Sequence, residues 1–221
     1  MKKGIVYYTN NNCNDIIFNA VIKRLSNICK KNNIDVVSVS HRPIDFGKNI
    51  IMDLPSRAES IFTQIYEGLL ASEADVIYLA EHDVLYHPSH FDFVPINKRV
   101  FYYNRNVWQV DYNTGEAVYK LSRRTSQLVA DKNELIIYFE KLLEIIKERG
   151  YSYKMGVSPR MHNIKGINNR GVVTFMSAFP NIDVRHGSNF SPYKYNKEKE
   201  IKANGVPNWG ITLNNFNKYL I

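Results

Sequence analysis

The sequence has little of what marks secreted, membrane or metal-finger proteins. It contains 2 cysteines among 221 residues, Cys13 and Cys29, and their spacing forms neither a CxxC pair nor a disulfide framework. No apolar run reaches the roughly 20 residues that span a bilayer, and the first residues lack the apolar stretch of a signal peptide. These absences predict a protein of the reducing cytoplasm.

Common phosphate-binding and nucleic-acid-binding motifs are also missing. Neither GxGxxG nor GxxxxGK[ST] occurs, which disfavours ordinary dinucleotide binding and P-loop chemistry. There is no signature of an RNA-recognition motif, a helix-turn-helix or a zinc finger. What remains is a chain with 44% hydrophobic residues, enough for one α/β domain with a full core.

Positive charge is in excess. Lys and Arg number 29 against 21 for Asp and Glu, a formal net charge of +8. Such an excess favours anionic partners, among them nucleic acids, nucleotides and anionic membranes. The alternative is that an AT-rich genome enriches lysine and asparagine codons. The basic clusters are Lys23-Arg24, Lys30-Lys31, Arg123-Arg124 and the charged segment 193–202.

Hydrophobic spacing predicts alternating strands and helices in the first third of the chain. Asn14 or Asp15 is expected to cap the first helix and Ser56 the second, because short polar side chains accept hydrogen bonds from free N–H groups. In chain order we expect a strand at 4–8, a helix with the stripe Ile17, Val21, Leu25 and Ile28, a strand at 34–39, a loop at 41–55 and a helix with the stripe Ile61, Ile65 and Leu69.

The later chain gives weaker signals. Residues 100–110 are rich in aromatics and interrupted at 104–106, which predicts two strands or one bent strand. A strand is expected at 117–121, and Asp131 and Gly150 are expected to bound a helix. Beyond it, short β-like pieces are expected near 172–175 and after Asn181.

The stretch 74–93, ADVIYLAEHDVLYHPSHFDF, gives the main functional prediction. Its apolar run at 76–79 is typical of a buried strand, and open α/β sheets bind ligands at the carboxyl ends of such strands. Glu81 and Asp83 follow directly and form a hard-oxygen site for a divalent cation and its phosphates. The alternative is that the two carboxylates only end the strand with solvated charge.

Three pieces together resemble the nucleotide-sugar glycosyltransferases of the GT-A fold: the opening GIVYYTNN, the Arg57 helix leading into ADVIYLAEHDVLY, and the late DVRHG. The resemblance implies an enzyme with a single Rossmann-like α/β domain, a mixed central sheet and flanking helices. Residues 1–110 would form the donor half and residues 111–221 the acceptor half.

In that family a strand ends in a short acidic motif, usually Asp-x-Asp, whose last acid holds Mn²⁺ or Mg²⁺ against the donor diphosphate. A late histidine often supplies a second ligand. The resemblance therefore implies Asp83 and His186 as metal ligands, with Glu81 replacing the usual first aspartate. Glu81, His82 and Asp83 would together contact a nucleotide sugar, with UDP-sugar as the expected donor. Carboxylate plus imidazole suits Mn²⁺.

Other residues are assigned by type and place. Thr9 and Asn10 follow the first strand and could meet the base or ribose; Arg57 and Arg123-Arg124 could reach phosphates. The acceptor side is predicted separately. Asp111 and Asp183 are the candidate bases, and Trp108 and Trp209 could stack on a sugar or a base or be core residues.

Two rival functions remain open. His82, His87 and His90 could form a zinc site for hydrolysis. Alternatively, the charge and the aromatics at 102–108 could serve a nucleic-acid-binding module without catalysis. The readings combine if the acceptor is a hydroxymethylated base in duplex DNA, as in phage DNA glycosyltransferases, with the segment 193–202 near the acceptor entrance.

Overall fold

The computed structural model describes residues 1–119, 121–152, 170–189, 201–203, 205–212 and 220. The charged segment predicted at 193–202 lies largely outside these residues, and only its last two positions are described, in a strand. None of the helices in the described ranges has the length and apolar character needed to cross a membrane.

A seven-stranded sheet forms the centre, in the order β10-β6-β9-β4-β1-β2-β3. Strands β3, β2, β1 and β4 are parallel; β9 runs antiparallel to both β4 and β6, and β10 is parallel to β6. The predicted mixed central sheet is therefore confirmed. The strands are β1 (Lys3–Thr9), β2 (Asp35–Ser40), β3 (Lys48–Ile51), β4 (Val76–Glu81), β6 (Val100–Asn104), β9 (Leu128–Asp131) and β10 (Gly171–Phe175).

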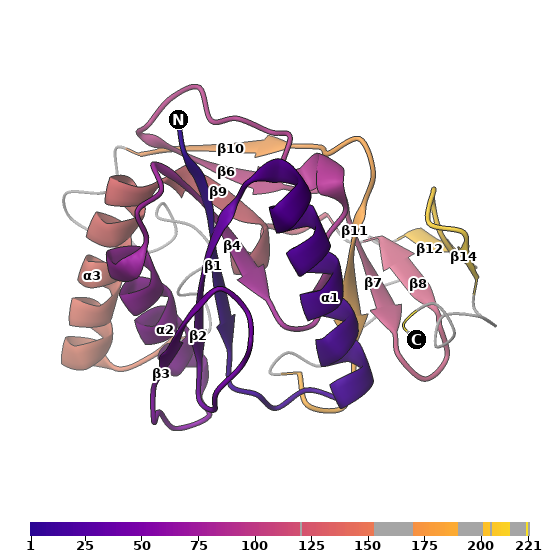
Figure 1. The fold of residues 1–221 in the computed structure, drawn as a ribbon, viewed down its shortest axis with the longest axis horizontal. Coiled ribbons are helices and arrows are strands. Elements are labelled where there is room, and N and C mark those ends of the chain that lie inside the picture. Colours follow the sequence, from indigo (N-terminus) through magenta and orange to yellow (C-terminus); the bar gives the residue numbers. More distant parts are fainter. Residues whose placement is uncertain (120, 153–169, 190–200, 204, 213–219, 221) are drawn as a thin grey trace.

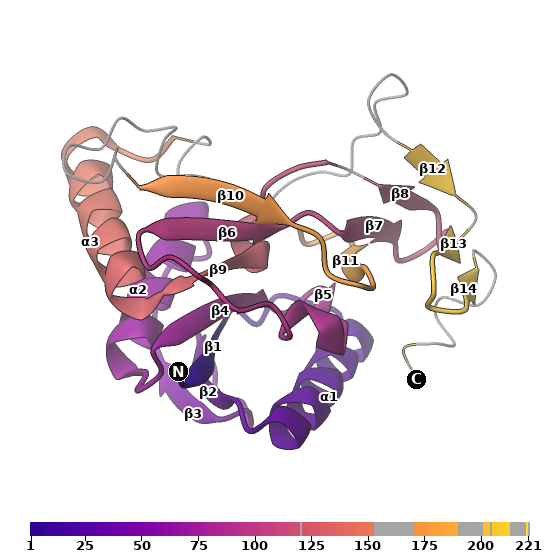
Figure 2. The same ribbon diagram turned by 90° about the horizontal axis from the view of Figure 1, so that it is seen from above.

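Among the described residues three α-helices cover the sheet: α1 (Asp15–Asn32), α2 (Ala58–Ala71) and α3 (Lys132–Arg149). Figure 2 shows α1 on one side of the sheet and α3 on the other. Alternate residues of β1 face the two layers, with Tyr7 in the core on the α1 side and Tyr8 in the core that includes α2 and α3. The predicted stripe of α1 is buried along its whole length.

The predicted N-terminal caps are present in two of the three helices, and Gly150 ends α3 as predicted. Asn14 caps α1 through its side chain, and Asp131 caps α3 by accepting hydrogen bonds from the N–H groups of residues 133 and 134. Ser56 does not cap α2, so that prediction is wrong. The capping residue is Arg57, and Ser56 Oγ instead accepts a 2.8 Å hydrogen bond from Asn10 Nδ2. The β1–α1 and β3–α2 loops are thereby joined.

A second sheet has the order β12-β8-β7-β11-β5. The aromatic run at 100–110 breaks as predicted, but its halves enter different sheets, β6 the first and β7 the second (Figure 1). The Asn104 side chain fixes the break by accepting hydrogen bonds from the N–H groups of Asn106 and Ser177. The strands are β5 (Val84–Leu85), β7 (Val107–Asp111), β8 (Ala117–Tyr119), β11 (Asn181–Arg185) and β12 (Ile201–Ala203), with a separate hairpin of β13 (Gly205–Val206) and β14 (Ile211–Thr212).

Two strands of the central sheet were not predicted. β3 lies inside the expected loop 41–55, where Gly47 at φ +65° turns the chain into a four-residue edge strand too short to show a period. β9 is also four residues long and runs directly into the cap of α3, so its apolar residues resemble the start of the helix. Pairing with β4 and β6, rather than local pattern, makes it a strand.

Candidate active site

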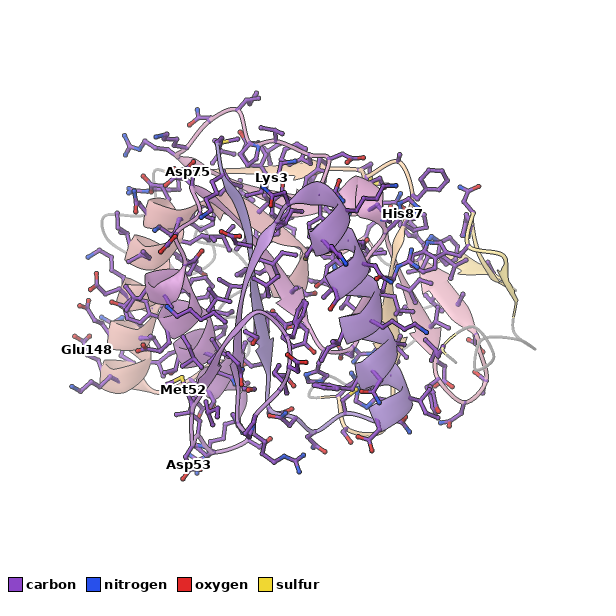
Figure 3. The ribbon with its side chains drawn as sticks, viewed as in Figure 1. Lys3, Met52, Asp53, Asp75, His87 and Glu148 are labelled. Carbon is purple, nitrogen blue, oxygen red and sulfur yellow. The ribbon has the colours of Figure 1, made fainter. Side chains whose placement is uncertain are left out.

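The candidate site lies where the parallel strands β1 and β4 end. In the sheet β1 lies between β2 and β4. Helix α1, on one face of the sheet, connects β1 to β2, and helix α2, on the opposite face, precedes β4. Strand order reverses at this point, and open α/β sheets bind ligands there. In Figure 3, Met52 and Asp53 after β3 mark this carboxyl edge at the bottom, while Lys3 and Asp75 mark the opposite edge.

Glu81 and Asp83 occupy this edge. Glu81 ends β4, and its Oε1 accepts a 2.6 Å hydrogen bond from Tyr8 Oη on β1. Asp83 is buried in the turn between β4 and β5, and its carbonyl accepts a 2.8 Å hydrogen bond from the N–H of Val184. Because β5 pairs with β11, the end of β11 is brought beside the acidic turn.

The pairing places His186 next to Asp83. His186 Nε2 lies 3.9 Å from Asp83 Oδ2, and both side chains are almost wholly covered. Asn189 connects the two residues: its Nδ2 donates to Asp83 Oδ2 at 2.6 Å, and its Oδ1 accepts from the backbone N–H of His186 at 2.5 Å. Two atoms bound to one cation at about 2.1 Å lie at most about 4.2 Å apart. The residues therefore fit a shared divalent cation.

The electrostatics of the edge favour a cation. Burial raises the pKa of Asp83, and burial together with the charge of Asp83 raises the pKa of Glu81 to about 8. Burial lowers the pKa of His82 and of His186, which keeps both imidazoles in the neutral form that binds metals. Two carboxyl groups that resist ionisation beside neutral imidazoles would gain from a bound positive charge.

Asp183 has a different environment although it is next to this site. Asp183, on β11, lies opposite Val84 of β5, the residue that follows Asp83, and is also buried. Its carboxylate contacts Arg124 Nη1 and Arg185 Nη1, the latter at 3.1 Å. Burial would raise the pKa of Asp183, but the two guanidinium groups outweigh burial and hold it below the usual value. Both carboxylate oxygens are therefore engaged by arginine.

The other predicted donor residues line the same edge in different ways. Thr9 is buried, and its Oγ1 accepts a hydrogen bond from the N–H of Asn11, so the hydroxyl stabilises the turn that follows β1. Asn10 is part-exposed and bonded to Ser56. Arg57 is exposed at the start of α2 and lies 3.9 Å from Glu59. Of the arginine pair, Arg124 belongs to the Asp183 cluster.

The predicted acceptor residues lie in the second sheet and beyond it. Asp111 Oδ1 accepts from the N–H groups of Asn113 and Thr114 and from the Thr114 hydroxyl, which closes a turn. Trp108 is buried against Tyr119. Trp209 is buried, and its Nε1 donates to the Pro180 carbonyl at 2.7 Å. The structure places both tryptophans in the core and brings neither into contact with Asp83.

Sequence reasoning did not select Cys13 or Asn189. Cys13 lies in the turn after β1 with its Sγ 3.6 Å from His186 Nε2, and Asn189 bonds both predicted metal ligands. The rule that strand carboxyl ends converge would have suggested Cys13; the Asn189 contacts depend on a turn that no motif encodes. Beside them is a cavity of about 410 Å³, lined by Asn12, Cys13, Asn14, Tyr112, Asn113, His186, Gly187 and Ser188.

The rival histidine set does not form. His90 is buried, with Nδ1 within 3.0 Å of the Asn104 amide and 3.2 Å of the Asn181 amide. His87 Nδ1 pairs with Ser89, and Figure 3 shows His87 in the upper half of the molecule, away from the carboxyl edge. Within the described part of the chain His82 gathers with Cys13 and His186 instead. The prediction that His82, His87 and His90 share a zinc ion is therefore wrong.

No protein-family profile and no curated protein matches the sequence. Solved structures to which the chain is similar are glycosyltransferases, as the sequence resemblance predicted. A glycosyltransferase that glycosylates the major capsid of PBCV-1 has TM-score 0.49 and 9% identity, over 80% of this chain and 82% of that one. A mutant of Drosophila β1,4-galactosyltransferase 7 in complex with manganese, UDP-Gal and xylobiose has TM-score 0.49 and 9% identity, over 90% of this chain and 78% of that one. S. aureus TarS with UDP-GlcNAc has TM-score 0.47 and 9% identity, over 88% of this chain and 62% of that one. Because these TM-scores are low, the likeness alone establishes no activity.

Proposed function

We propose that the protein is a metal-dependent glycosyltransferase that moves a sugar from a nucleotide-sugar donor, a UDP-sugar, to a hydroxyl acceptor. One observation carries the proposal: Asp83 and His186, from distant parts of the sequence, meet at the carboxyl edge of the sheet with Asn189 bonded to both. A divalent cation there, Mn²⁺ or Mg²⁺, would offset the charge that develops on the leaving diphosphate.

The chain's own residues have distinct tasks in this proposal. Asp83 and His186 hold the cation, and Asn189 joins the Asp83 carboxylate to the backbone of His186. The β1–α1 loop with Thr9 and Asn10, and Arg57 at the start of α2, would bind the base, ribose or phosphates. These donor contacts lie in residues 1–110, while His186 and Asn189 come from 111–221, so the proposed donor and acceptor halves share the cation.

The base that deprotonates the acceptor is proposed to be Asp111 rather than Asp183. Tyr112 and Asn113, which follow Asp111, line the cavity beside His186, whereas both oxygens of Asp183 contact arginines. A general base must reach the acceptor hydroxyl, and a carboxylate held between two cations is a weak one. If the acceptor is large, Trp108 and Trp209 could contribute only after rearrangement, because both are buried.

For the acceptor we propose a polyanion, duplex DNA that carries a base hydroxyl. A cavity of about 620 Å³ on α1 is lined by Lys23, Arg24, Asn27 and Lys31 among others, and the chain carries a net charge of +8. Contacts to phosphates would make binding weaken steeply with salt. Transfer to hydroxymethylated DNA, and none to unmodified DNA, is the expected result; binding without transfer would indicate a nucleic-acid-binding module.

The test of the donor proposal is calorimetry with UDP in the presence and absence of Mn²⁺. Binding should require the metal, and Asp83→Asn should weaken it about 100-fold, since the variant removes a charged ligand but keeps the shape. Asp92→Asn is the matched control, because Asp92 is exposed in the same acidic segment. UDP binding that is equal with and without metal, or unchanged in Asp83→Asn, would overturn the proposal.

A further inference from the structure

Three side chains at the carboxyl edge form a second kind of metal-binding group. Cys13, His82 and His186 each offer a ligand atom, and these atoms all lie within 4.8 Å of one another. The residues come from three segments: the turn after β1, the turn after β4 and the loop after β11. In the part of the chain that the structure describes, no other group of three or more such side chains approaches this closely.

The contacts within the group point to a missing ligand. Cys13 Sγ is 3.6 Å from His186 Nε2, and the rings of His82 and His186 have centroids 6.3 Å apart. His82 Nδ1 is buried and has no hydrogen-bond partner among the described residues. A buried polar atom without a partner costs about 1–3 kcal/mol, which a bound ion or water would recover.

The position of Cys13 suits metal binding. Its Sγ lies 3.6 Å from His186 Nε2 and 3.9 Å from the carbonyl oxygen of His82, so the sulfur faces both other residues of the group. A cysteine that coordinates a cation through its sulfur does so as the thiolate.

We propose that Cys13, His82 and His186 bind a zinc-type divalent cation. Asp83 Oδ2 lies 3.9 Å from His186 Nε2 and is a neighbour of the three ligand atoms, which approach one another within 4.8 Å, rather than a member of the set. One thiolate and two imidazoles match the three protein ligands of a tetrahedral Zn²⁺ site that keeps its fourth position open.

The ligand set decides the metal preference. Mg²⁺ and Mn²⁺ favour carboxylate and water, whereas a thiolate selects zinc-like ions. The inference concerns the same cation site as the proposed sugar transfer, and it predicts that the site binds Zn²⁺ and Co²⁺ more tightly than Mn²⁺. It does not require that any sugar be transferred, because the test measures cation binding to the protein alone.

The experiment is a titration of the metal-free full chain with Co²⁺, followed by optical absorption. A sulfur-to-cobalt charge-transfer band in the near ultraviolet and intense tetrahedral bands in the visible are expected, and Zn²⁺ should displace the cobalt. Cys13→Ser should abolish the charge-transfer band and weaken Zn²⁺ at least about tenfold. Cys29→Ala is the matched control, since Cys29 is the chain's other cysteine and is buried on α1.

Two further variants separate the outcomes. His82→Ala should weaken Co²⁺ binding about tenfold or more, while His87→Ala, at a histidine outside the group, should not change it. Thermal unfolding without metal checks that each variant is folded. A charge-transfer band that persists in Cys13→Ser, or weak octahedral cobalt spectra in the parent chain, would overturn the inference. If the cobalt test fails but UDP binding depends on manganese, the zinc-site inference is wrong and the proposed function stands. If the cobalt band appears but UDP does not bind, the zinc-site inference stands and the proposed function is wrong.

Discussion

Asp83, in the turn before β5, and Asp183, on the neighbouring strand β11, both carry buried carboxylates, and their surroundings differ in one respect. Asp183 lies between two guanidinium groups, and its pKa is lowered against the effect of burial. Asp83 faces an imidazole and an amide, and burial raises its pKa. The protein thus supplies the positive charge for one carboxylate and leaves it to a ligand for the other. Completed charge pairing marks a structural cluster, and incomplete pairing marks a binding site.

The largest expected effect separates these two carboxylates by stability. Asp183→Asn removes the negative charge that pairs with Arg124 and Arg185, and it should lower the free energy of unfolding by about 3–5 kcal/mol. Asp83→Asn in metal-free protein should leave the free energy unchanged or raise it, because the charged form is disfavoured in the fold. Denaturant unfolding at neutral pH measures both. Equal losses in the two variants would remove the distinction.

A smaller effect is expected at the residue that orients the open carboxylate. Asn189→Ala removes the hydrogen bonds to Asp83 Oδ2 and to the His186 N–H, and it should weaken cation binding about tenfold. Asn189→Asp gives a second readout, since the added charge should shift the pH dependence of metal binding. Ser188→Ala is the control, because only the backbone N–H of exposed Ser188 contacts His186. Unchanged metal affinity in Asn189→Ala would show that Asn189 does not position the Asp83 carboxylate for the cation.

The last expected effect depends on pH and concerns Glu81. Its pKa in the folded protein is about 8, against 4.5 ordinarily, so its favourable contribution is complete below pH 4.5 and is lost as the pH rises through 8. Glu81→Gln should therefore become more stable relative to the parent as the pH rises over this interval, by up to about 1.4 kcal/mol for each pKa unit between the unfolded and folded values.

Unfolding of metal-free protein at several pH values measures the Glu81 effect. Glu140→Gln is a matched control: Tyr66 Oη donates to Glu140 Oε1 at 3.3 Å on the exposed surface, as Tyr8 Oη does to Glu81 in the interior. A stability difference between Glu81→Gln and the parent that does not grow with pH would contradict the raised pKa.

The sequence is informative where one element carries its own pattern. The four-residue stripe of α1, the apolar run of β4 and the caps at Asn14 and Asp131 are local signals, and the structure confirms each. The proximity of Asp83 and His186 came from a family resemblance rather than from spacing. The roles of the site residues, and the division into donor and acceptor halves, stay predictions.

Other features depend on contacts that a local pattern does not contain. β9 is a strand because β4 and β6 flank it, and β7 leaves the central sheet because Asn104 bonds Asn106 and Ser177. Cys13 resembled an isolated thiol, since its partners lie 69 and 173 residues away. The sequence allowed Trp209 to be a stacking residue or a core residue, and the bond from its Nε1 to Pro180 places it in the core.

The β5–β11 pairing has a consequence for the order of folding. It joins residues about 100 positions apart, and Asn189 reaches Asp83 across 106 residues. Closing so long a loop is entropically costly and brings no local contacts, so such pairings form late. Strands β1 to β4 can assemble before β11 arrives, in a state with a sheet but no completed ligand set. Metal affinity followed during refolding would therefore appear after most of the secondary structure.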